Sequence, residues 1–408
     1  MRVLFIAPRL PWPADTGGKI RTLNILKQLT TFAEVDLVCF SFEPDDERHR
    51  RQLRQAMHLD VHLVPHRDPS LSRRIRQLLE PRPLSVAKYE ANAMAAKIKS
   101  LLLGRVYDAA HIDHIHMAQY HPNVADLPCY IDDHNVEFKI LERCANVEKN
   151  TIKKEIYRRQ AAKMKVFETQ ALKDCSACGA VSEEDARILK DLASVAVHVV
   201  PNGVDTEYFK PQDAVTAKKE ETALVYTGSM DWLPNEDAVL FMVKDILPLL
   251  WAKNPDIIFY IVGKNPSPQV RALTDQEKRI VVTGSVDDVR PYIASVQVFV
   301  CPLRIGGGTR LKILEAMSME KAVVATRVGA EGIDYQDRID IAVEDEPQAF
   351  ADRVLALLDD PMTRRKMGEN GRRLVVKKYD WHIVGKKLRE IYKTLGQIKS
   401  GQDDTLKK

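Results

Sequence analysis

Short apolar runs rich in β-branched residues alternate with helical segments, and this alternation occurs twice along the chain. The first series contains RVLFIA, VDLVCF, VHLV, YDAAHI, CYIDD and HVVP, and the second contains ALVYTG, IIFYIVG, RIVVTG, VQVFVCP and AVVAT. Strands separated by helices are typical of βα units that build a parallel sheet. A chain of 408 residues exceeds the size at which one core stops growing. The sequence therefore predicts an α/β protein with two Rossmann-like, doubly wound parallel-sheet domains that face a cleft.

The boundary between the two series lies in VVPNGVDTEYFKPQDAVTAKKEE, where Pro and Gly are followed by a charged tail without strand or helix periodicity. We predict one domain in residues 1–200 and a second in residues 201–378. Residues 379–408 are predicted to be an amphipathic helix that crosses back to the N-terminal domain, followed by a frayed tail. Ligands of such sheets bind at the carboxyl ends of the strands, so the site is expected there.

Composition excludes several classes of protein. No stretch approaches the ~20 apolar residues that a membrane span needs, and the start MRVLFIAPRLPWP lacks the order of a signal peptide. Six cysteines are too sparse for a disulfide scaffold. We therefore expect a cytoplasmic protein, with peripheral association at the inner face of the plasma membrane as an open alternative.

Positive charge is concentrated in residues 48–105, which hold thirteen Lys or Arg against four acids. The simplest interpretation is solvated helix faces, and contact with an anionic membrane or a phosphate-bearing acceptor is the alternative. Nucleic acid is not expected as a partner, because no aromatic residues accompany the charge.

The most informative motif is PLRIGGGTRLKILEAM, which follows an apolar strand and opens a helix. Its glycines allow close approach of the backbone to a ligand, and the first amides of a helix attract an anion. The two cations that follow suit a diphosphate, although a Gly-rich turn that only connects strand to helix is the alternative. The predicted anion site comprises Gly306, Gly307, Gly308, Thr309, Arg310 and Lys312.

Glu315 follows two turns further along this helix. A carboxylate in that place can accept hydrogen bonds from two vicinal hydroxyls, such as those of a ribose. The alternative is a solvated glutamate beside the buried face of the helix.

Three motifs together resemble the retaining GT-B glycosyltransferases of family four, and the likeness spans nearly the whole chain. They are PLRIGGGTRLKILEAMSMEKAVVATRVGAEGI, VPNGVD and the GG pair after the first strand. More narrowly, APRLPWPADTGGKIRT, DDHNVEF and TGSMDWLPNEDAV resemble the exosortase-associated sugar transferases of bacterial exopolysaccharide clusters. The resemblance implies an acceptor-side N-terminal domain and a C-terminal domain that binds the nucleotide-sugar donor.

The resemblance also implies a role for several residues. Gly17 and Gly18 would approach the donor diphosphate or the acceptor, and His134 would lie near the transferred sugar. A histidine that only bonds to its own loop is the alternative for His134. Diphosphate contacts are implied for Gly228 and Ser229, and backbone contacts to the nucleobase for the Thr283–Val286 loop, here Gly284 and Val286.

Two departures from the family pattern bear on the charge at the site. Glu315 matches the second glutamate of a pair, whereas Gly307 stands where the first is expected, and the usual Arg and Lys after the Gly228 strand are absent. We expect Arg310 and Lys312 to supply the missing positive charge, with a contribution from Arg304.

The resulting hypothesis is a retaining hexosyltransferase whose catalytic residues are His134, Arg310, Lys312 and Glu315. It would use a UDP- or GDP-linked sugar, no cofactor and no metal, with a glycan or lipid-linked glycan of exopolysaccharide synthesis as acceptor. A dehydrogenase is disfavoured because no GxGxxG follows the first strand. A nucleotide-sugar epimerase of the same architecture and a non-catalytic partner subunit stay open.

Overall fold

The computed structural model describes residues 1–212 and 222–399, which divide into two compact units. The first unit consists of residues 1–201 and the described residues from Val384 onward, and the second consists of Asn202–Ile383. The charged end of the predicted linker, residues 213–221, and the predicted frayed tail, residues 400–408, lie outside the described residues.

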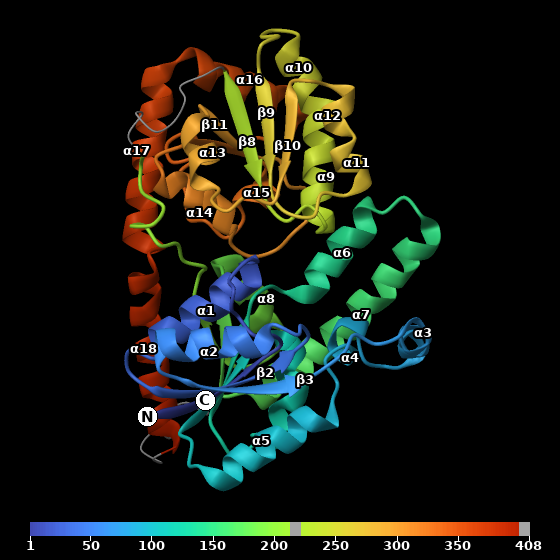
Figure 1. The fold of residues 1–408 in the computed structure, drawn as a ribbon, viewed down its shortest axis with the longest axis vertical. Helices are drawn as coiled ribbons and strands as arrows, with labels where there is room; N and C mark the ends of the chain where they lie inside the picture. The colour runs from blue at the N-terminus through green and yellow to red at the C-terminus, as the bar shows by residue number, and fades with distance from the viewer. Residues whose placement is uncertain (213–221, 400–408) are drawn as a thin grey trace. The chain divides into compact units, whose positions relative to one another are not determined.

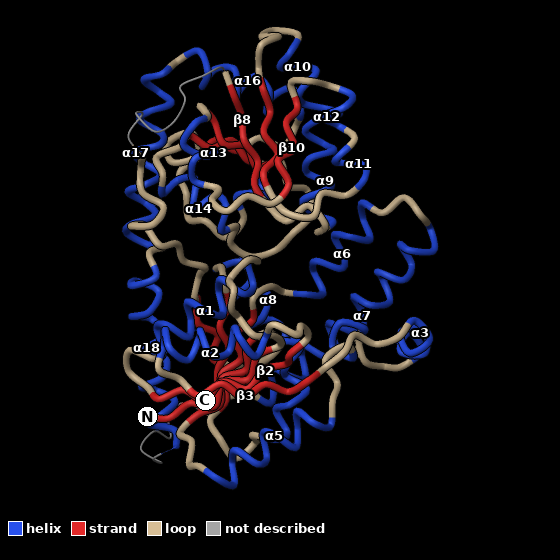
Figure 2. The backbone as a smooth tube through the Cα atoms, viewed as in Figure 1, coloured by secondary structure: helices blue, strands red, loops and turns tan. Residues whose placement is uncertain are grey.

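In the described part of the first unit, seven parallel strands form one sheet in the order β3-β2-β1-β4-β5-β6-β7. The strands in the middle of this sheet are almost wholly buried, because helices lie on both faces (Figure 1 and Figure 2). The strands are β1 (Arg2–Ala7), β2 (Glu34–Ser41), β3 (Asp60–Pro65), β4 (Ala109–Asp113), β5 (Cys129–Asp133), β6 (Ala177–Ala180) and β7 (Ala196–Val199).

The helices of the first unit include the last described element of the chain. Helix α18 (Trp381–Lys399) begins at the end of the second unit, and from Val384 onward it belongs to the first. The others are α1 (Gly17–Leu29), α2 (Asp46–Met57), α3 (Leu71–Leu79), α4 (Leu84–Ala87), α5 (Asn92–Gly104), the 3₁₀ helix η1 (Ile115–Asn123), α6 (Glu137–Val147), α7 (Thr151–Asp174) and α8 (Glu183–Leu192).

The described second unit contains six parallel strands in the order β10-β9-β8-β11-β12-β13, again between helices (Figure 1). They are β8 (Ala223–Thr227), β9 (Ile258–Val262), β10 (Ile280–Gly284), β11 (Val298–Cys301), β12 (Ala322–Ala325) and β13 (Ala342–Val343). The helices are α9 (Leu233–Phe241), the π-helical turn η2 (Met242–Ile246), α10 (Leu247–Trp251), α11 (Pro268–Arg271), α12 (Leu273–Gln276), α13 (Arg290–Ser295), α14 (Leu311–Ser318), α15 (Arg327–Ala330), α16 (Pro347–Asp359) and α17 (Pro361–Lys378).

Each unit has its own hydrophobic core, built from the strands and the apolar faces of the helices that cover them. Both sheets are doubly wound, because the strand order reverses between β1 and β4 in the first unit and between β8 and β11 in the second. This confirms the predicted α/β class. At such a reversal the two connecting loops diverge and leave a crevice at the carboxyl ends of the strands.

Candidate active site

The glycine loops predicted from the sequence lie at the strand reversal of the second sheet. Gly228 directly follows β8, and Gly306–Gly308 follow β11. Gly308 has a φ of 68°, a left-handed conformation that glycine adopts without strain. The two loops therefore flank the crevice where the ligand of a doubly wound sheet is expected.

Lys312 connects these two loops. Its Nζ donates hydrogen bonds to Tyr226 Oη at 2.8 Å and to Asn235 Oδ1 at 2.9 Å. A Cβ atom placed on Gly228 would lie 2.8 Å from the same nitrogen. Burial, with a smaller contribution from the charge of Arg310, lowers the pKa of Lys312 to about 8. The structure thus places a partly buried cation against the glycine loop that follows β8.

Arg310 turns back into its own loop. Its guanidinium donates to the carbonyl oxygen of Gly307 and lies 3.7 Å from Glu331 Oε2. Helix α14 begins at Leu311, later than the predicted start near Thr309, because Arg310 has an extended backbone with φ −83° and ψ 106°. Arg310 therefore shapes the loop, and Glu331 partly neutralises its charge.

Arg304 is directed away from these groups. Its guanidinium pairs with Asp237 at 2.5 Å and lies 4.5 Å from the centre of the Phe241 ring. Its predicted contribution to the anion site is therefore not supported by the geometry.

Glu315 lies one turn beyond Lys312 and is half-buried. Within the described residues, its carboxylate has no hydrogen bond or ion pair to another side chain. Burial raises the pKa of Glu315 to about 7, against the opposing charge of Lys312. A buried carboxylate without protein donors is suited to accept hydrogen bonds from a ligand.

The remaining predicted residues of the second unit surround the same end of the sheet. Ser229 donates to Asp231 at 2.6 Å, and the Gly263 amide donates to the Gly284 carbonyl at 3.2 Å. Gly284 has a φ of 71°, with open space where a side chain would be. Val286 packs against the edge of the core.

In the first unit, the reversal lies between β1 and β4. Gly17 and Gly18 begin helix α1 after the β1 loop and are exposed to solvent. β4 is followed directly by His114, and the neighbouring β5 by His134. The parallel register pairs Asp113, the last residue of β4, with Asp132, one residue before the end of β5, so both histidines emerge at the same edge of the sheet.

His134 belongs to a buried network that sequence reasoning missed. Arg21 forms a 2.6 Å ion pair with Asp132, and His134 Nε2 lies 3.0 Å from Asp113 and 3.2 Å from Asp132. Thr22 donates to Asp113 at 2.8 Å. Burial alone would lower the pKa of His134, but the two aspartates outweigh it and raise the pKa to about 9. His134 has an exposed fraction of 5% and therefore lies beneath the protein surface.

The fold also brings together metal-ligating side chains that the sequence analysis did not expect. Two groups have ligand atoms within 4.8 Å of one another, His111 with Asp113 and Asp132, and His114 with His116 and Glu137. The expectation of no metal cluster rested on spacing along the chain, whereas these groups come from different elements. Only HIDHIH hinted at such a cluster.

Two family models match the chain. Residues 16–208 match the family described as Glycosyltransferase Family 4, and residues 221–360 match the one described as Glycosyl transferases group 1. None of the described helices is long and apolar enough to cross a lipid bilayer.

Curated relatives are about a quarter identical to the chain over the part that aligns. A GDP-mannose-dependent monoacylated alpha-(1-6)-phosphatidylinositol monomannoside mannosyltransferase of Corynebacterium glutamicum is 26% identical over 212 residues, which are 47% of this chain and 55% of the relative. The phosphatidylinositol N-acetylglucosaminyltransferase GPI3 subunit of Saccharomyces cerevisiae is 26% identical over 236 residues, 54% of this chain and 50% of the subunit. The chain thus spans about half the length of the curated relatives it matches.

Solved structures are similar over almost the full length. Sucrose-phosphate synthase from Thermosynechococcus elongatus has a TM-score of 0.72 at 16% identity, covering 97% of this chain and 99% of that one. HepE of Anabaena, solved in complex with UDP-glucose, has a TM-score of 0.68 at 16% identity, covering 97% and 100%. These likenesses show the GT-B fold, and the two family matches, each over less than half of the chain, support a GT-B glycosyltransferase of family 4.

Proposed function

We propose that the chain is a glycosyltransferase that moves a sugar from a nucleotide diphosphate donor to an acceptor. The observation that carries this proposal is the position of Lys312 against Gly228, at the strand reversal of the second unit. A preorganised cation beside glycine-rich backbone favours the diphosphate, and it stabilises the charge that develops on the leaving phosphate.

The roles of the other residues follow from their surroundings. Lys312 and the amides of 306–309 would hold the leaving diphosphate, and Glu315 would accept from the ribose hydroxyls of the donor. Arg310 would act through its loop, by holding Gly307 in place. His134 would act as a positioning residue whose buried positive charge orients the groups above it.

The donor is proposed to be a UDP- or GDP-linked sugar. The Corynebacterium relative is named as GDP-mannose-dependent, and HepE was solved with UDP-glucose. The base would be bound by the backbone of the Gly284–Val286 loop, which explains why the side chains do not reveal its identity. Retention of configuration at the sugar C1 is part of the proposal and rests on the sequence resemblance alone.

The acceptor is proposed to be a lipid-linked glycan at an anionic membrane surface. Helix α3 supports this, because Leu71, Ile75 and Leu79 are 75%, 57% and 88% exposed and follow one another at four-residue spacing. Arg73, Arg74 and Arg76 lie on the same helix. A helix with exposed apolar residues and arginines is typical of a segment that lies in a membrane interface. A place in exopolysaccharide synthesis rests on the narrower sequence resemblance.

Nucleotide release tests the activity. The protein is incubated with UDP-glucose or GDP-mannose, with and without a lipid-linked glycan, and released UDP or GDP is measured. Release that depends on acceptor supports the transferase, and NMR of the product anomer then decides retention. Conversion of the donor sugar without acceptor would instead identify an epimerase. No conversion together with no nucleotide binding would favour a non-catalytic subunit.

Vesicle co-sedimentation tests the membrane proposal separately. We expect binding to vesicles with an anionic lipid and little binding to neutral vesicles. Ile75→Ser should weaken this binding, whereas Val376→Ser, at a 42% exposed apolar residue of α17, should leave it unchanged. Equal losses for both variants would remove the specific role of α3.

A further inference from the structure

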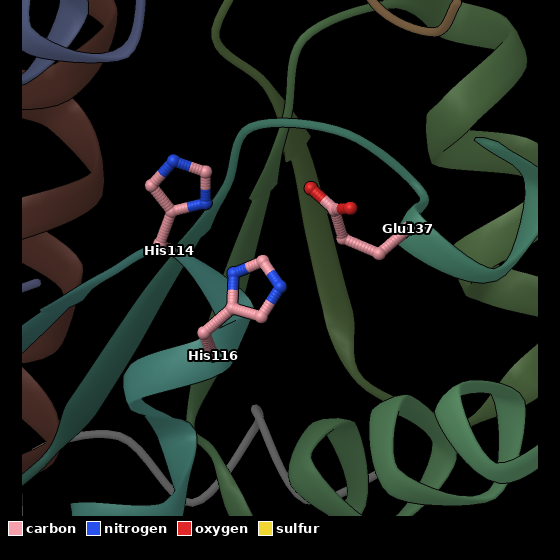
Figure 3. Close-up of side chains that lie close together, drawn as sticks. All are labelled: His114, His116 and Glu137. Atoms are coloured by element: carbon pink, nitrogen blue, oxygen red, sulfur yellow. The ribbon is translucent and has the colours of Figure 1, made fainter. Parts of the chain in front are cut away.

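His114, His116 and Glu137 converge at the carboxyl edge of the first sheet. His114 follows β4, His116 lies in the first turn of η1, and Glu137 is the first residue of α6. One ligand atom from each lies within 4.8 Å of the others. Figure 3 shows the two imidazoles side by side, with the Glu137 carboxylate pointing toward them. Three separate segments thus supply two nitrogen ligands and one oxygen ligand to one place.

One imidazole nitrogen of each histidine in this cluster has no hydrogen-bond partner among the described residues. His114 Nδ1 and His116 Nε2 are both buried, and within the described residues neither has a hydrogen-bond partner. Such orphaned polar atoms are rare and call for a ligand or ion. The neighbouring His111 group differs, because Asp113 accepts from Thr22 and Asp132 pairs with Arg21.

The backbone of His114 is held in a strained conformation. Its φ of 73° and ψ of 133° lie in a region that residues other than glycine rarely adopt. The His114 amide donates to the Asp132 carbonyl at 3.0 Å, and the His114 carbonyl accepts from Met117 at 2.9 Å. A strained backbone conformation that is held by hydrogen bonds at the end of a strand is typical of residues at functional sites.

The charges around the cluster suit a cation. The buried network next to the cluster has two positive groups, Arg21 and His134, opposed by two aspartates. The Glu137 carboxylate therefore adds a negative charge beside a balanced neighbourhood.

We propose that His114, His116 and Glu137 form a binding site for a first-row divalent cation, with Zn²⁺ as the probe. Two imidazoles and one carboxylate are a ligand set found in zinc sites that keep a coordination position open. Tetrahedral zinc at its usual bond lengths has ligand atoms about 3.3 Å apart. A separation of up to 4.8 Å is closed by modest side-chain rotation.

The open position would face an oxygen of a substrate. A Cβ atom placed on Gly18 would lie 3.6 Å from His114 Nε2, and Gly18 is itself exposed at the start of α1. A hydroxyl or phosphate oxygen that approaches Gly18 would therefore reach the Nε2 edge of His114, beside the cluster. This last role rests on the proposed transfer activity, whereas binding of the ion does not.

Isothermal titration of ZnCl₂ into the full-length protein, freed of metal by a chelator and dialysis, tests the site. We expect one equivalent to bind with a Kd in the micromolar range or below. Glu137→Gln, which keeps the shape of the side chain, and His116→Ala should each weaken binding at least tenfold. The matched control is His121→Ala, at a histidine of the same 3₁₀ helix that is absent from the cluster, and it should bind as the wild type does.

Circular dichroism verifies that each variant is folded, and Glu137→Gln decides the matter if His116→Ala does not fold. The absence of a transition below millimolar ZnCl₂, or an equal loss in the His121 control, would overturn the proposal. The titration contains no nucleotide or sugar, so its outcome is independent of the transfer assay. Zinc binding can be absent while glycosyl transfer is observed, and zinc binding can be observed while transfer is absent.

Discussion

Lys312→Met separates a lysine that serves a ligand from one that only holds the fold. The side chain keeps its length and loses its charge and its bonds to Tyr226 and Asn235. Tyr226 Oη still donates to Asn235 Oδ1 at 2.7 Å, so the variant leaves no new unsatisfied group between them. The substitution therefore changes the charge at the glycine loop with little disturbance of its surroundings.

The effect on stability can be worked from the pKa. A fall from 10.5 to about 8 means that below pH 8 the folded chain bears a cost of about 3 kcal/mol for holding the charge. Removing the charge removes this cost, but it also removes two ammonium hydrogen bonds of about 1.5–3 kcal/mol each. The gain of about 3 kcal/mol is offset by a loss of about 3–6 kcal/mol, so we expect the free energy of unfolding to fall by no more than about 3 kcal/mol.

For the binding of a diphosphate, by contrast, Lys312→Met is expected only to lower the affinity. Losing one charge-assisted hydrogen bond of about 1.5–3 kcal/mol weakens nucleotide binding by roughly 10- to 150-fold. Urea unfolding and titration calorimetry with UDP and GDP measure the two quantities. A variant that binds the nucleotide as the wild type does and loses more than about 3 kcal/mol of stability would show that Lys312 is structural.

Three further predictions concern stability, each measured by urea unfolding. The pKa of Glu315 is raised from 4.5 to about 7, so the group contributes about 3 kcal/mol to the free energy of unfolding below pH 4.5. This contribution is lost as the pH rises through 7. Glu315→Gln should abolish that pH dependence of stability, and an unaltered profile would contradict the assignment. Gly263→Ala should cost about 3 kcal/mol because the new Cβ would overlap the carbonyl oxygen of Gly228, whereas Gly104→Ala, with open space around it, should cost less than about 1 kcal/mol; similar losses would refute the packing argument. Arg21→Met should cost about 3–5 kcal/mol because it removes one of the two cations that pair with the buried Asp132, and a loss below about 1 kcal/mol would be inconsistent with the ion pair.

Much of the fold could be predicted because hydrophobic patterning is local. RVLFIA and CYIDD form β1 (Arg2–Ala7) and β5 (Cys129–Asp133) as predicted, and the long amphipathic segment from Thr151 forms α7. The edge strand Ala342–Val343 was not predicted, because a run of two residues is too short to show a hydrophobic period. The segment KDCSACGAVS is typical of a strand that enters the core, and its ACGA forms β6.

In the candidate site, too, the residues that are contiguous in the sequence could be predicted and those brought together by the fold could not. The loop around Gly306–Gly308 could be found because its glycines and cations are contiguous in the sequence. The groups around His114 and His134 could not, because they depend on the pairing of β4 with β5, in which Asp113 lies opposite Asp132. That register and the return of Arg21 from α1 are tertiary facts that no local pattern contains.

The position of helix α18 bears on how the chain folds during synthesis. Tyr392 of this helix is buried in the first unit, where its hydroxyl lies 2.6 Å from His111 Nδ1 in β4, and Leu388 and Leu395 are buried beside it. A ribosome that has completed residues 1–201 has therefore not yet delivered one wall of that unit's core. The second unit is contiguous and has all its strands before α18 is translated, so it can reach its native state while the earlier unit still waits for its last helix.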